Sequence, residues 1–569
     1  MAGGDATDGA APAAARVAQT TDGVTLTAYS ALGTVLLAFD LEQRLTDGLA
    51  GFAVSRRSPD GATAPLLNRL SFEQKITAGT TPEQREWTPS DRAPFQKFRW
   101  IDFPTEVRSG QYGYELSAVY FAGGSLRRGP SVSVSLDLAP RAFGRLSLGF
   151  TRGYLSSQAY AERFDNAAFA PTPRTLDYDT APFEKQYEWL GYQARVLLLE
   201  FLDEVAADPG IDLDVFVFDF DEPEIVRRLV QLGPRLRIFM DDANLHVGVG
   251  DLEPVARRRL EASAGSGSVR TGHFHNFAHS KVMIQKRDGR ATKVLTGSAN
   301  FSVRGLYVQA NNVLVIDDPE VAALYEQAFE EAFTDMRGFS ASAVAQRWFE
   351  FSRPQLPPLG VSLAPHRSAS MSLDRVAEAI GKAGSSVLFA VMELGGGGEV
   401  LAALQQAPSS GRVFSYGVTQ TTGGLKLYKP GQGSGDLASF AYLKGKVPMP
   451  FRQEWSGGAG QVIHHKFVVV DFNDRHPCVF AGSSNLSQGG EEANGDNLLS
   501  IPDPGVATAY AIEAIRLFDH YHFRDAMQKA TDERPLTLQG PGVSPPWWQP
   551  YYDPTNIKSR DRALFGGGP

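Results

Sequence analysis

Residues 462–487, VIHHKFVVVDFNDRHPCVFAGSSNLS, are the stretch on which the expected fold and chemistry depend. Alternation along a strand puts residues i and i+2 on one face, so His464 and Lys466 project together while His465 points away. The next strand runs into a turn, GSSN at residues 482–485, that is rich in N–H and O–H donors. An imidazole and an ammonium beside such a turn suit a bound phosphate.

The same pattern occurs once earlier, in HSKVMIQKRDGRATKVLTGSANFS, which begins at residue 279. His279 and Lys281 are again two residues apart. The glycine of GSAN, at residues 297–300, follows its histidine by 18 residues, the same distance as in the second copy. A single H-x-K is nearly uninformative, whereas two copies with one spacing predict an internal duplication with a period of 185 residues.

These residues resemble the phospholipase D superfamily, whose signature is H-x-K-x4-D followed by G-S/G-x-N, present twice. The second copy is complete and has Asp471 as the acid, which the family uses mainly for structure. The first copy departs from the signature, because Lys286 stands where the acid should be. The resemblance covers roughly residues 144–527 and implies two α/β lobes that form one site, with no metal and no other cofactor.

The resemblance also implies a role for each motif residue. One histidine would attack phosphorus to form a phosphohistidine, and the other would protonate the leaving alcohol. The lysines would hold the charged oxygens, and the two turns would complete the phosphate cradle. The catalytic candidates are His279, Lys281, His464 and Lys466, and the phosphate-binding candidates are Ser298, Asn300, Ser483 and Asn485.

In the family, an acid shortly after each G-S-x-N turn orients a histidine. Asp496 is the candidate in the second lobe, and the amide Asn311 stands at the matching place in the first. A carboxylate stabilises the imidazolium, whereas an amide only orients the ring. If Asp496 serves the histidine of its own lobe, His464 is the nucleophile; family precedent for His279 is the alternative.

The predicted fold class is α/β, with two duplicated lobes preceded by an all-β domain. Short alternating runs separated by turns predict the β-sandwich, which resembles immunoglobulin or fibronectin type III domains. The proline-rich stretch at residues 352–360 is expected to link the lobes. The aromatic tail sequence SPPWWQPYYDP is expected to lie strapped across a lobe, with a membrane interface as the alternative. The expected segments are a disordered leader at 1–22, the sandwich at 23–140, lobes at 144–345 and 360–530, and a tail at 531–569.

Composition limits the cellular setting and the partners. The chain has 569 residues and a formal net charge of −9, which argues mildly against an open nucleic-acid surface. Cys478 is its only cysteine, so no intramolecular disulfide can form. No run approaches the roughly 18 apolar residues that a membrane-spanning helix needs, and the leader lacks the apolar core of a signal peptide. We therefore expect a cytoplasmic protein.

Three functions remain open at this stage. The first is a phospholipase D-like phosphodiesterase acting on a phospholipid or another phosphodiester. The second is a metal-independent nuclease that uses the same histidines on nucleic acid. The third is a non-catalytic interaction protein that binds a partner through its β-sandwich.

Overall fold

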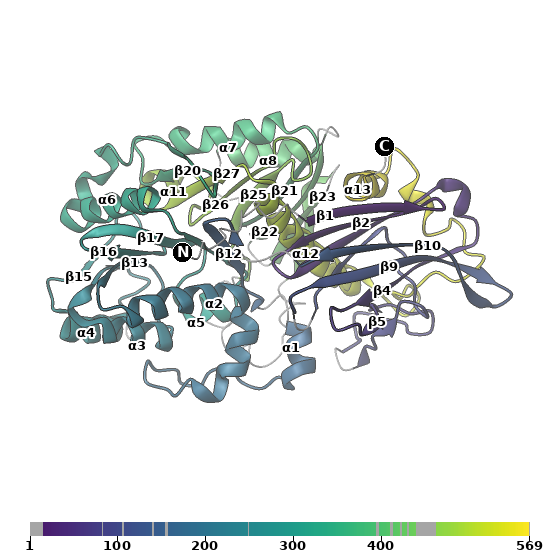
Figure 1. Ribbon diagram of the computed structural model, residues 1–569, viewed down its shortest axis with the longest axis horizontal. Coiled ribbons are helices and arrows are strands. Elements are labelled where there is room, and N and C mark those ends of the chain that lie inside the picture. Colours follow the sequence, from purple (N-terminus) through teal and green to yellow (C-terminus); the bar gives the residue numbers. More distant parts are fainter. Residues whose placement is uncertain are drawn as a thin grey trace, which may run out of the picture.

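The structure, a computed structural model, describes residues 15–567 except 82–83, 105–106, 139–141, 154–156, 249, 394–397, 410–412, 422–423, 430–431 and 440–461. A β-rich body forms one end of the molecule, and two α/β halves form the other (Figure 1). Helix α12 (Pro504–Lys529) runs between them and contacts both β2 and β22.

The β-rich body consists of two four-stranded antiparallel sheets. The first has the order β1-β2-β3-β8 and the second β10-β9-β4-β5. Their shared core is formed by apolar side chains such as Leu26, Phe39, Phe52 and Leu116. The bounds are β1 (Ala15–Thr21), β2 (Val24–Ala31), β3 (Thr34–Leu41), β4 (Leu49–Arg57), β5 (Thr63–Pro65), β8 (Arg99–Asp102), β9 (Gln111–Ala122) and β10 (Ser125–Asp137), with the small pair β6 (Leu67–Asn68) and β7 (Thr88–Pro89) beside them.

Strand β1 corrects the expected disordered leader. Residues 15–21 pair with β2 along their whole length, from Ala15 opposite Ser30 to Thr21 opposite Val24. The alternation in ARVAQTT was hidden by the small-residue composition around it. Residues 1–14 lie outside the described residues.

The first α/β half contains an eight-stranded sheet in the order β11-β12-β18-β17-β16-β13-β14-β15. Its strands are β11 (Ala142–Phe143), β12 (Leu146–Phe150), β13 (Ile211–Val217), β14 (Leu236–Asp241), β15 (Val269–Gly272), β16 (Val282–Arg287), β17 (Arg290–Gly297) and β18 (Asn312–Ile316). Its helices are α1 (Ser157–Phe164), α2 (Glu184–Ala207), α3 (Pro223–Leu232), α4 (Glu253–Ala264), α5 (Val303–Tyr307) and α6 (Pro319–Asp335).

The second half contains a nine-stranded sheet in the order β19-β20-β27-β26-β25-β21-β22-β23-β24. Its strands are β19 (Phe349–Arg353), β20 (Leu356–Leu363), β21 (Ser386–Glu393), β22 (Phe414–Thr421), β23 (Gly424–Lys429), β24 (Gln432–Ser439), β25 (Lys466–Val470), β26 (Cys478–Gly482) and β27 (Asn497–Ile501). The other helices here are α7 (Ser370–Lys382), α8 (Glu399–Ser409) and α11 (Gln488–Ala493).

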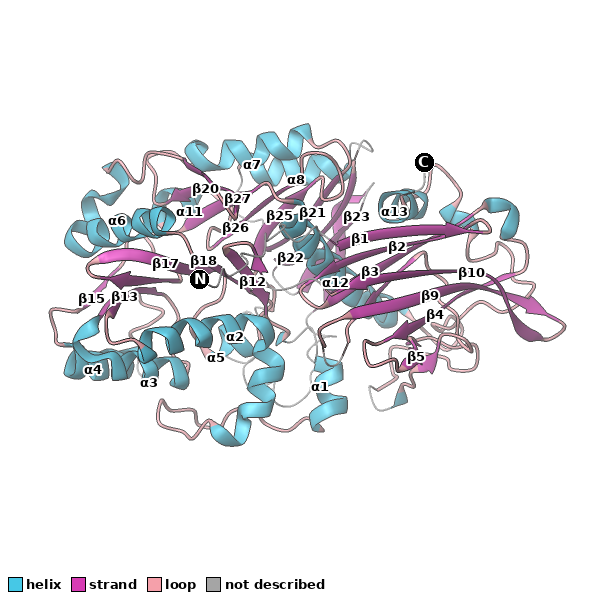
Figure 2. Cartoon of the chain, viewed as in Figure 1, coloured by secondary structure: helices cyan, strands magenta, loops and turns pink. Residues whose placement is uncertain are grey.

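The two sheets share a series of six corresponding strands. The series β12-β18-β17-β16-β13-β14 corresponds to β20-β27-β26-β25-β21-β22, and each series has one parallel pair, β13 with β14 and β21 with β22. Helices cover the outer faces of both halves (Figure 2). The predicted α/β fold class is therefore confirmed, including the duplication inferred from the spacing of the motifs.

The expected proline-rich linker at residues 352–360 is wrong. These residues belong to the hairpin of β19 and β20, which joins the second sheet. Strand β20 pairs with β27 only from Gly360 onward. Pro357 and Pro358 therefore lie where β20 has a neighbour on one side only, which is where a strand tolerates a residue without an N–H group.

The aromatic tail lies on the β-sandwich and not on a lobe. Trp547 and Tyr551 enter the sandwich core, and Trp547 Nε1 donates a hydrogen bond to the Leu49 carbonyl at 3.0 Å. Helix α13 (Ile557–Gly566) then packs on β3 and β2. Because these rings are buried, they do not form a membrane interface. Among the helices that the structure describes, none is long and apolar enough to cross a membrane.

Candidate functional site

The two motif histidines meet at the junction of the duplicated halves. Their ring centroids are 6.4 Å apart, and both side chains are buried. His279 lies just before β16, and His464 lies just before β25, so each is at the start of a central strand of its own sheet. Lys466 is the first residue of β25, whereas the sequence predicted that the strand would also include His464. The duplication thus brings residues 185 positions apart into one site.

Backbone pairing between the halves determines which groups reach which histidine. The segment before His279 pairs with the segment before Asp496: Gly495 N donates to the Phe277 carbonyl at 2.8 Å. In the same way, His464 N donates to the Ala310 carbonyl at 3.1 Å, next to Asn311. Each motif therefore lies against the segment that follows the G-S-x-N turn of the opposite half.

His279 is oriented by a carboxylate. Its Nδ1 lies 2.7 Å from Asp496 Oδ1, and both side chains are buried. Burial and the charge of Lys281 lower the pKa of His279, while Asp496 opposes that shift. Burial raises the pKa of Asp496, but the charges of His279 and Lys281 outweigh it and the net shift is downward. With Asp496 accepting, the Nδ1 atom of His279 carries the proton and Nε2 is free.

His464 is oriented by neutral groups. Its Nδ1 lies 2.9 Å from Asn311 Oδ1 and 2.9 Å from the Ser298 carbonyl, and both are acceptors. Burial lowers the pKa of His464 well below its usual value, and the charges of Lys466 and Lys281 lower it further. The pairing expected from sequence order, Asp496 with His464, is therefore wrong. The halves exchange their orienting residues because each motif pairs with the other half's backbone.

The two lysines lie buried in the same site. Lys466 Nζ donates to the His464 carbonyl at 2.8 Å, and Lys281 Nζ donates to the His279 carbonyl. Neither ammonium has a carboxylate within 4.0 Å among the residues that the structure describes. Burial lowers the pKa of Lys281 to about 8 and that of Lys466 well below its usual value. Two lysines with no carboxylate in direct contact among the described residues make this a favourable place for a bound anion.

The serine hydroxyls of the G-S-x-N turns are used differently from what the sequence suggested. Ser298 Oγ donates to Asn311 Oδ1 at 2.8 Å and accepts from Asn312 N at 3.0 Å. Ser483 Oγ accepts from Asn497 N at 3.0 Å. Both serines are fully buried. The expectation that their hydroxyls line the phosphate cradle is thus corrected: they hold the segments that orient the histidines.

The asparagines of the turns remain candidates for the cradle. Asn300 is buried and Asn485 is half-buried, and the Oδ1 atom of each has no hydrogen-bond partner among the described residues. Asn300 Nδ2 donates to Asp219 Oδ2 at 2.5 Å, which defines the orientation of its amide.

The motif acid differs between the halves. Asp471 caps the start of β21, since its Oδ1 accepts from the N–H groups of Ser385 at 2.7 Å and Ser386 at 2.9 Å. Lys286 takes the corresponding place in the first half, on β16, and lies 2.7 Å from Glu326 Oε1. Neither residue touches the histidines directly.

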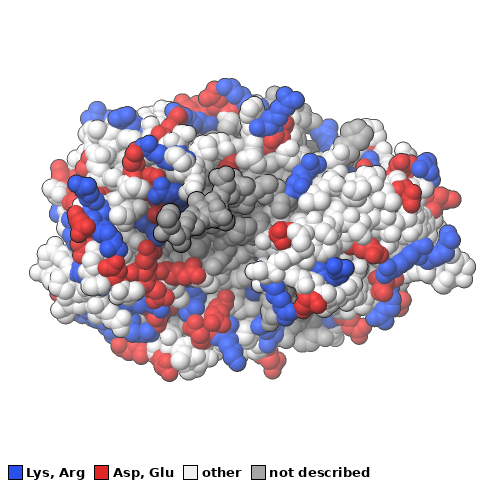
Figure 3. Space-filling view, in the orientation of Figure 1, with Lys and Arg blue, Asp and Glu red and all other residues white. Residues whose placement is uncertain are grey.

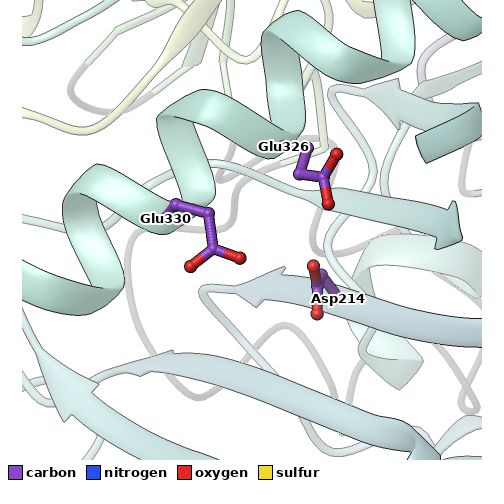
Figure 4. Close-up of side chains that lie close together, drawn as sticks. All are labelled: Asp214, Glu326 and Glu330. Atoms are coloured by element: carbon purple, nitrogen blue, oxygen red, sulfur yellow. The ribbon is translucent and has the colours of Figure 1, made fainter. Parts of the chain in front are cut away.

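Three carboxylates near Lys286 have the spacing of a metal site: Asp214 on β13 and Glu326 and Glu330 on α6 point toward one another (Figure 4). Two cations already lie among them. Arg237 Nη2 donates to Asp214 at 2.6 Å and to Glu330 at 2.5 Å, and Lys286 pairs with Glu326. This group is therefore an ion-pair network in which Lys286 replaces the motif acid.

Three residues near His279 were not predicted from the sequence: His246, Asp219 and Asp241. His246 lies in the loop after β14, with one ring nitrogen 2.9 Å from Asp219 and the other 2.9 Å from Asp241. The two aspartates lie at or just beyond the carboxyl ends of the parallel strands β13 and β14. That position is where ligand-binding groups gather in α/β sheets, and it was the available signal.

Comparison with known proteins connects the first half with named families. Residues 207–333 match the family model described as cardiolipin synthase, PLD-like domain. The chain is similar to a mitochondrial cardiolipin hydrolase of Xenopus tropicalis, with 29% identity over 126 residues, which is 22% of this chain and 55% of the relative. It is also similar to a phospholipase D of Rickettsia felis, with 33% identity over 95 residues, which is 17% of this chain and 42% of the relative. The chain thus spans about half the length of the curated relatives it matches.

Among solved structures, phosphatidylserine synthase of Haemophilus influenzae Rd KW20 aligns with 58% of this chain and 89% of its own, at 14% identity and a TM-score of 0.39. The matched family segment contains His279, Lys281 and the first G-S-x-N turn. This segment of the first half is therefore similar to PLD-like domains.

Proposed function

We propose that this protein is a phosphodiesterase that acts through a phosphohistidine intermediate. The observation that carries the proposal is the composite site, in which two buried histidines with centroids 6.4 Å apart are flanked by two buried lysines. Within the described part of the chain, neither lysine makes a direct ion pair with a carboxylate. A phosphodiester between the rings would offer its phosphorus to one Nε2 and its leaving oxygen to the other. Its negative charge would be held by Lys281 and Lys466.

The crossed orientation favours His279 as the nucleophile. The attacking imidazole becomes positively charged when its Nε2 bonds to phosphorus, and Asp496 on its Nδ1 stabilises that charge. His464 then donates its Nε2 proton to the leaving alkoxide as the phosphorus–oxygen bond breaks. In the second step His464 takes a proton from water, the water oxygen bonds to phosphorus, and the phosphorus–nitrogen bond to His279 breaks.

His464 needs a proton to act as the acid, although burial and the charges of the lysines lower its pKa. A bound phosphodiester brings a negative charge that opposes both lysines. Substrate binding therefore raises the pKa of His464 toward the range in which it can donate. The acid becomes active only when the substrate is present.

A phospholipid is the substrate class we favour. Leu245 and Val247 are 66% and 52% exposed, and they flank His246, whose contact with Asp219 places them at the edge of the site. Exposed apolar side chains at that edge suit a lipid surface. Basic and acidic side chains are interspersed over the face seen in Figure 3, whereas a nucleic-acid surface usually carries a basic stripe. The cytoplasmic location expected from the sequence is also part of this proposal.

The test is incubation of the wild type, His279→Ala and His464→Ala with phosphatidylcholine vesicles and ethanol, and separately with plasmid DNA in EDTA. We expect phosphatidylethanol from the wild type and a loss of several orders of magnitude in both variants. Nicking of DNA in EDTA, without lipid turnover, would establish the nuclease instead. Wild-type turnover by either single variant, on a substrate with a poor leaving group, would exclude the composite site.

A further inference from the structure

A buried histidine outside the two motifs has a carboxylate at each ring nitrogen. His246 is 3% exposed, with Nδ1 2.9 Å from Asp241 Oδ1 and Nε2 2.9 Å from Asp219 Oδ1. Ionised carboxylates only accept hydrogen bonds, so both ring nitrogens must donate, which describes an imidazolium. Burial lowers the pKa of His246, but the hydrogen bonds to Asp219 and Asp241 outweigh it and raise that pKa to about 10.

Both carboxylates continue into the candidate site. Asp219 Oδ2 accepts from Asn300 Nδ2 at 2.5 Å, and Asn300 is the asparagine of the first G-S-x-N turn. Asp241 Oδ2 accepts at 2.6 Å from Ala278 N, the residue before His279. One hydrogen-bonded chain thus runs from the backbone beside His279, through Asp241, His246 and Asp219, to the amide of Asn300.

The aromatic ring of Phe218 packs this chain against the catalytic groups. Its centroid lies 4.4 Å from that of His246 and 4.7 Å from that of His279, and Lys281 Nζ lies 4.7 Å from it. Among the other charged groups, Glu253 interacts electrostatically with His246, and Lys281 interacts with Asp219. Two carboxylates beside a site for an anion would repel the substrate unless a cation lies between them.

In the second half, an uncharged side chain accepts the corresponding backbone hydrogen bond. Met240 on β14 pairs with Val217, and Thr419 on β22 pairs with Val391, so the next residue, Gln420, corresponds to Asp241. Gln420 Oε1 accepts from Val462 N at 3.0 Å, much as Asp241 accepts from Ala278 N. A carboxylate thus occupies this position in the first half only, and there His246 lies beside it.

We propose that His246 is a positioning residue for phosphate binding: its imidazolium neutralises one of the two carboxylates beside the site and holds Asp219 where it orients the Asn300 amide. This inference rests on the proposed phosphodiesterase function. It adds a third histidine, which touches no reacting atom, to the groups that prepare the site for an anionic substrate.

The test compares His246→Gln with His273→Gln. His273 is the matched control, because it forms a histidine–carboxylate contact from the same region, 2.6 Å from Asp242 Oδ1, but is exposed. Measured quantities are KM and kcat on bis(p-nitrophenyl) phosphate and the affinity for inorganic phosphate by calorimetry. We expect His246→Gln to raise KM and weaken phosphate binding about tenfold or more, with a smaller change in kcat, and the control to stay within about twofold of wild type.

A second variant separates this role from simple support of the fold. In Asp219→Asn/His246→Gln the uncompensated negative charge is removed, so most of the lost phosphate affinity should return. A normal KM and phosphate affinity in His246→Gln would overturn the inference. It would also be overturned if His246→Gln lowered only kcat and thermal stability and the Asp219→Asn/His246→Gln variant did not restore them.

Two further readouts distinguish failure of this inference from failure of the proposed function. Nitrogen NMR of the wild type at pH 8.5 should show His246 as an imidazolium, and a neutral ring would overturn the inference even in an active enzyme. A wild type that binds phosphate in a His246-dependent way but cleaves no diester would contradict the phosphodiesterase and leave the positioning role intact. A wild type that binds no phosphate would overturn both.

Discussion

Asp496 makes the two histidines chemically unequal. His279 has this buried carboxylate at 2.7 Å, whereas His464 has only the Asn311 amide and a backbone carbonyl, each at 2.9 Å. A charge-assisted hydrogen bond is roughly twice as strong as a neutral one, so the cationic form of His279 is the better stabilised. The carboxylate beside His279 thus supports our proposal that His279 is the nucleophile.

The first prediction concerns Asp496→Asn. An amide keeps the shape but removes the charge that stabilises the phosphorylated imidazole, which costs about 1–2 kcal/mol and lowers kcat by about tenfold or more. Acid-free digestion of trapped enzyme, followed by mass mapping, should place the phosphoryl adduct on the peptide containing His279. An adduct on the peptide containing His464 would show that the orienting carboxylate does not select the nucleophile.

The second prediction concerns the cost of burying Lys466. Burial lowers the pKa of Lys466 well below its usual value, and the charge of Lys281 lowers it further. The unfolded chain therefore binds this proton more tightly than the folded one, so the charge reduces stability at every pH below about 10.4. The reduction disappears as pH rises through that value.

Lys466→Met should accordingly raise the free energy of unfolding at pH 7 while abolishing activity. Urea unfolding between pH 7 and pH 10.5 should show the difference from wild type narrowing as pH rises. The control is Lys382→Met on α7, where the lysine is 75% exposed and pairs with Glu378. A less stable Lys466→Met protein at pH 7 would mean that the ammonium stabilises the fold.

At the scale of elements, each G-S-x-N turn depends on its glycine. Gly297 and Gly482 have φ angles of +143° and +141°, and a Cβ on either would lie 2.4 Å from the carbonyl oxygen of Asn312 or Asn497. That contact brings β26 close to the start of β27, which follows Asp496 directly. The glycine thus controls where the orienting residue lies.

Gly482→Ala should therefore lower the free energy of unfolding by roughly 2–4 kcal/mol, since backbone must move to admit the methyl group. Activity should fall by more than the folded fraction does, because Asp496 moves with the strand. Gly489→Ala on the neighbouring α11 meets no atom within 4 Å and should be within about 0.5 kcal/mol of wild type. Chemical unfolding and turnover at a temperature where both variants are folded test this.

The loop after β14 is the element through which the lipid hypothesis can be tested. Leu245 and Val247 point into solvent on either side of the anchored His246. Leu245→Asp/Val247→Asp should reduce turnover of phosphatidylcholine vesicles about tenfold and leave turnover of bis(p-nitrophenyl) phosphate within about twofold. Equal effects on the vesicle and soluble substrates would contradict a role for this loop at a lipid surface.

The spacing of the motifs was sufficient to predict the duplication, because a repeated unit repeats its topology, whereas the convergence of His279 and His464 was implied by the family resemblance. The exchange of orienting residues could not be predicted, since it depends on backbone pairs such as Gly495 with Phe277. The hairpin of β23 and β24 was missed because its sequence is rich in glycine and lysine. Strand β1 was missed for a similar reason, as its small and polar residues gain their order from pairing with β2.

At the scale of the whole molecule, one largely buried ion-pair network joins the sandwich, the tail and the second half. Arg99 on β8 donates to Asp519 on α12 at 2.6 Å and to Asp561 on α13 at 2.9 Å. Tyr416 on β22 donates to Asp561 at 2.9 Å. Four elements far apart in sequence therefore share two carboxylates and one guanidinium.

This network predicts that the sandwich and the α/β halves unfold together. In Arg99→Met the buried Asp561 and the half-buried Asp519 lose their main partner, which should cost about 3–5 kcal/mol. Arg56→Met is the matched control, because Arg56 pairs with Asp102 at 2.9 Å within the sandwich alone. Unfolding can be followed by tryptophan fluorescence, by circular dichroism and by loss of turnover.

The three signals should coincide in the wild type, because three of the seven tryptophans, Trp100, Trp547 and Trp548, lie in or pack against the sandwich core and turnover reports on the site between the halves. In Arg99→Met the unfolding midpoints of the three signals should separate, because the contacts between the sandwich and the α/β halves are lost first. In Arg56→Met the fluorescence midpoint should shift more than the other two. Coincident midpoints in Arg99→Met at unchanged stability would show that apolar packing of α12 and α13 joins the parts without help from the buried charges.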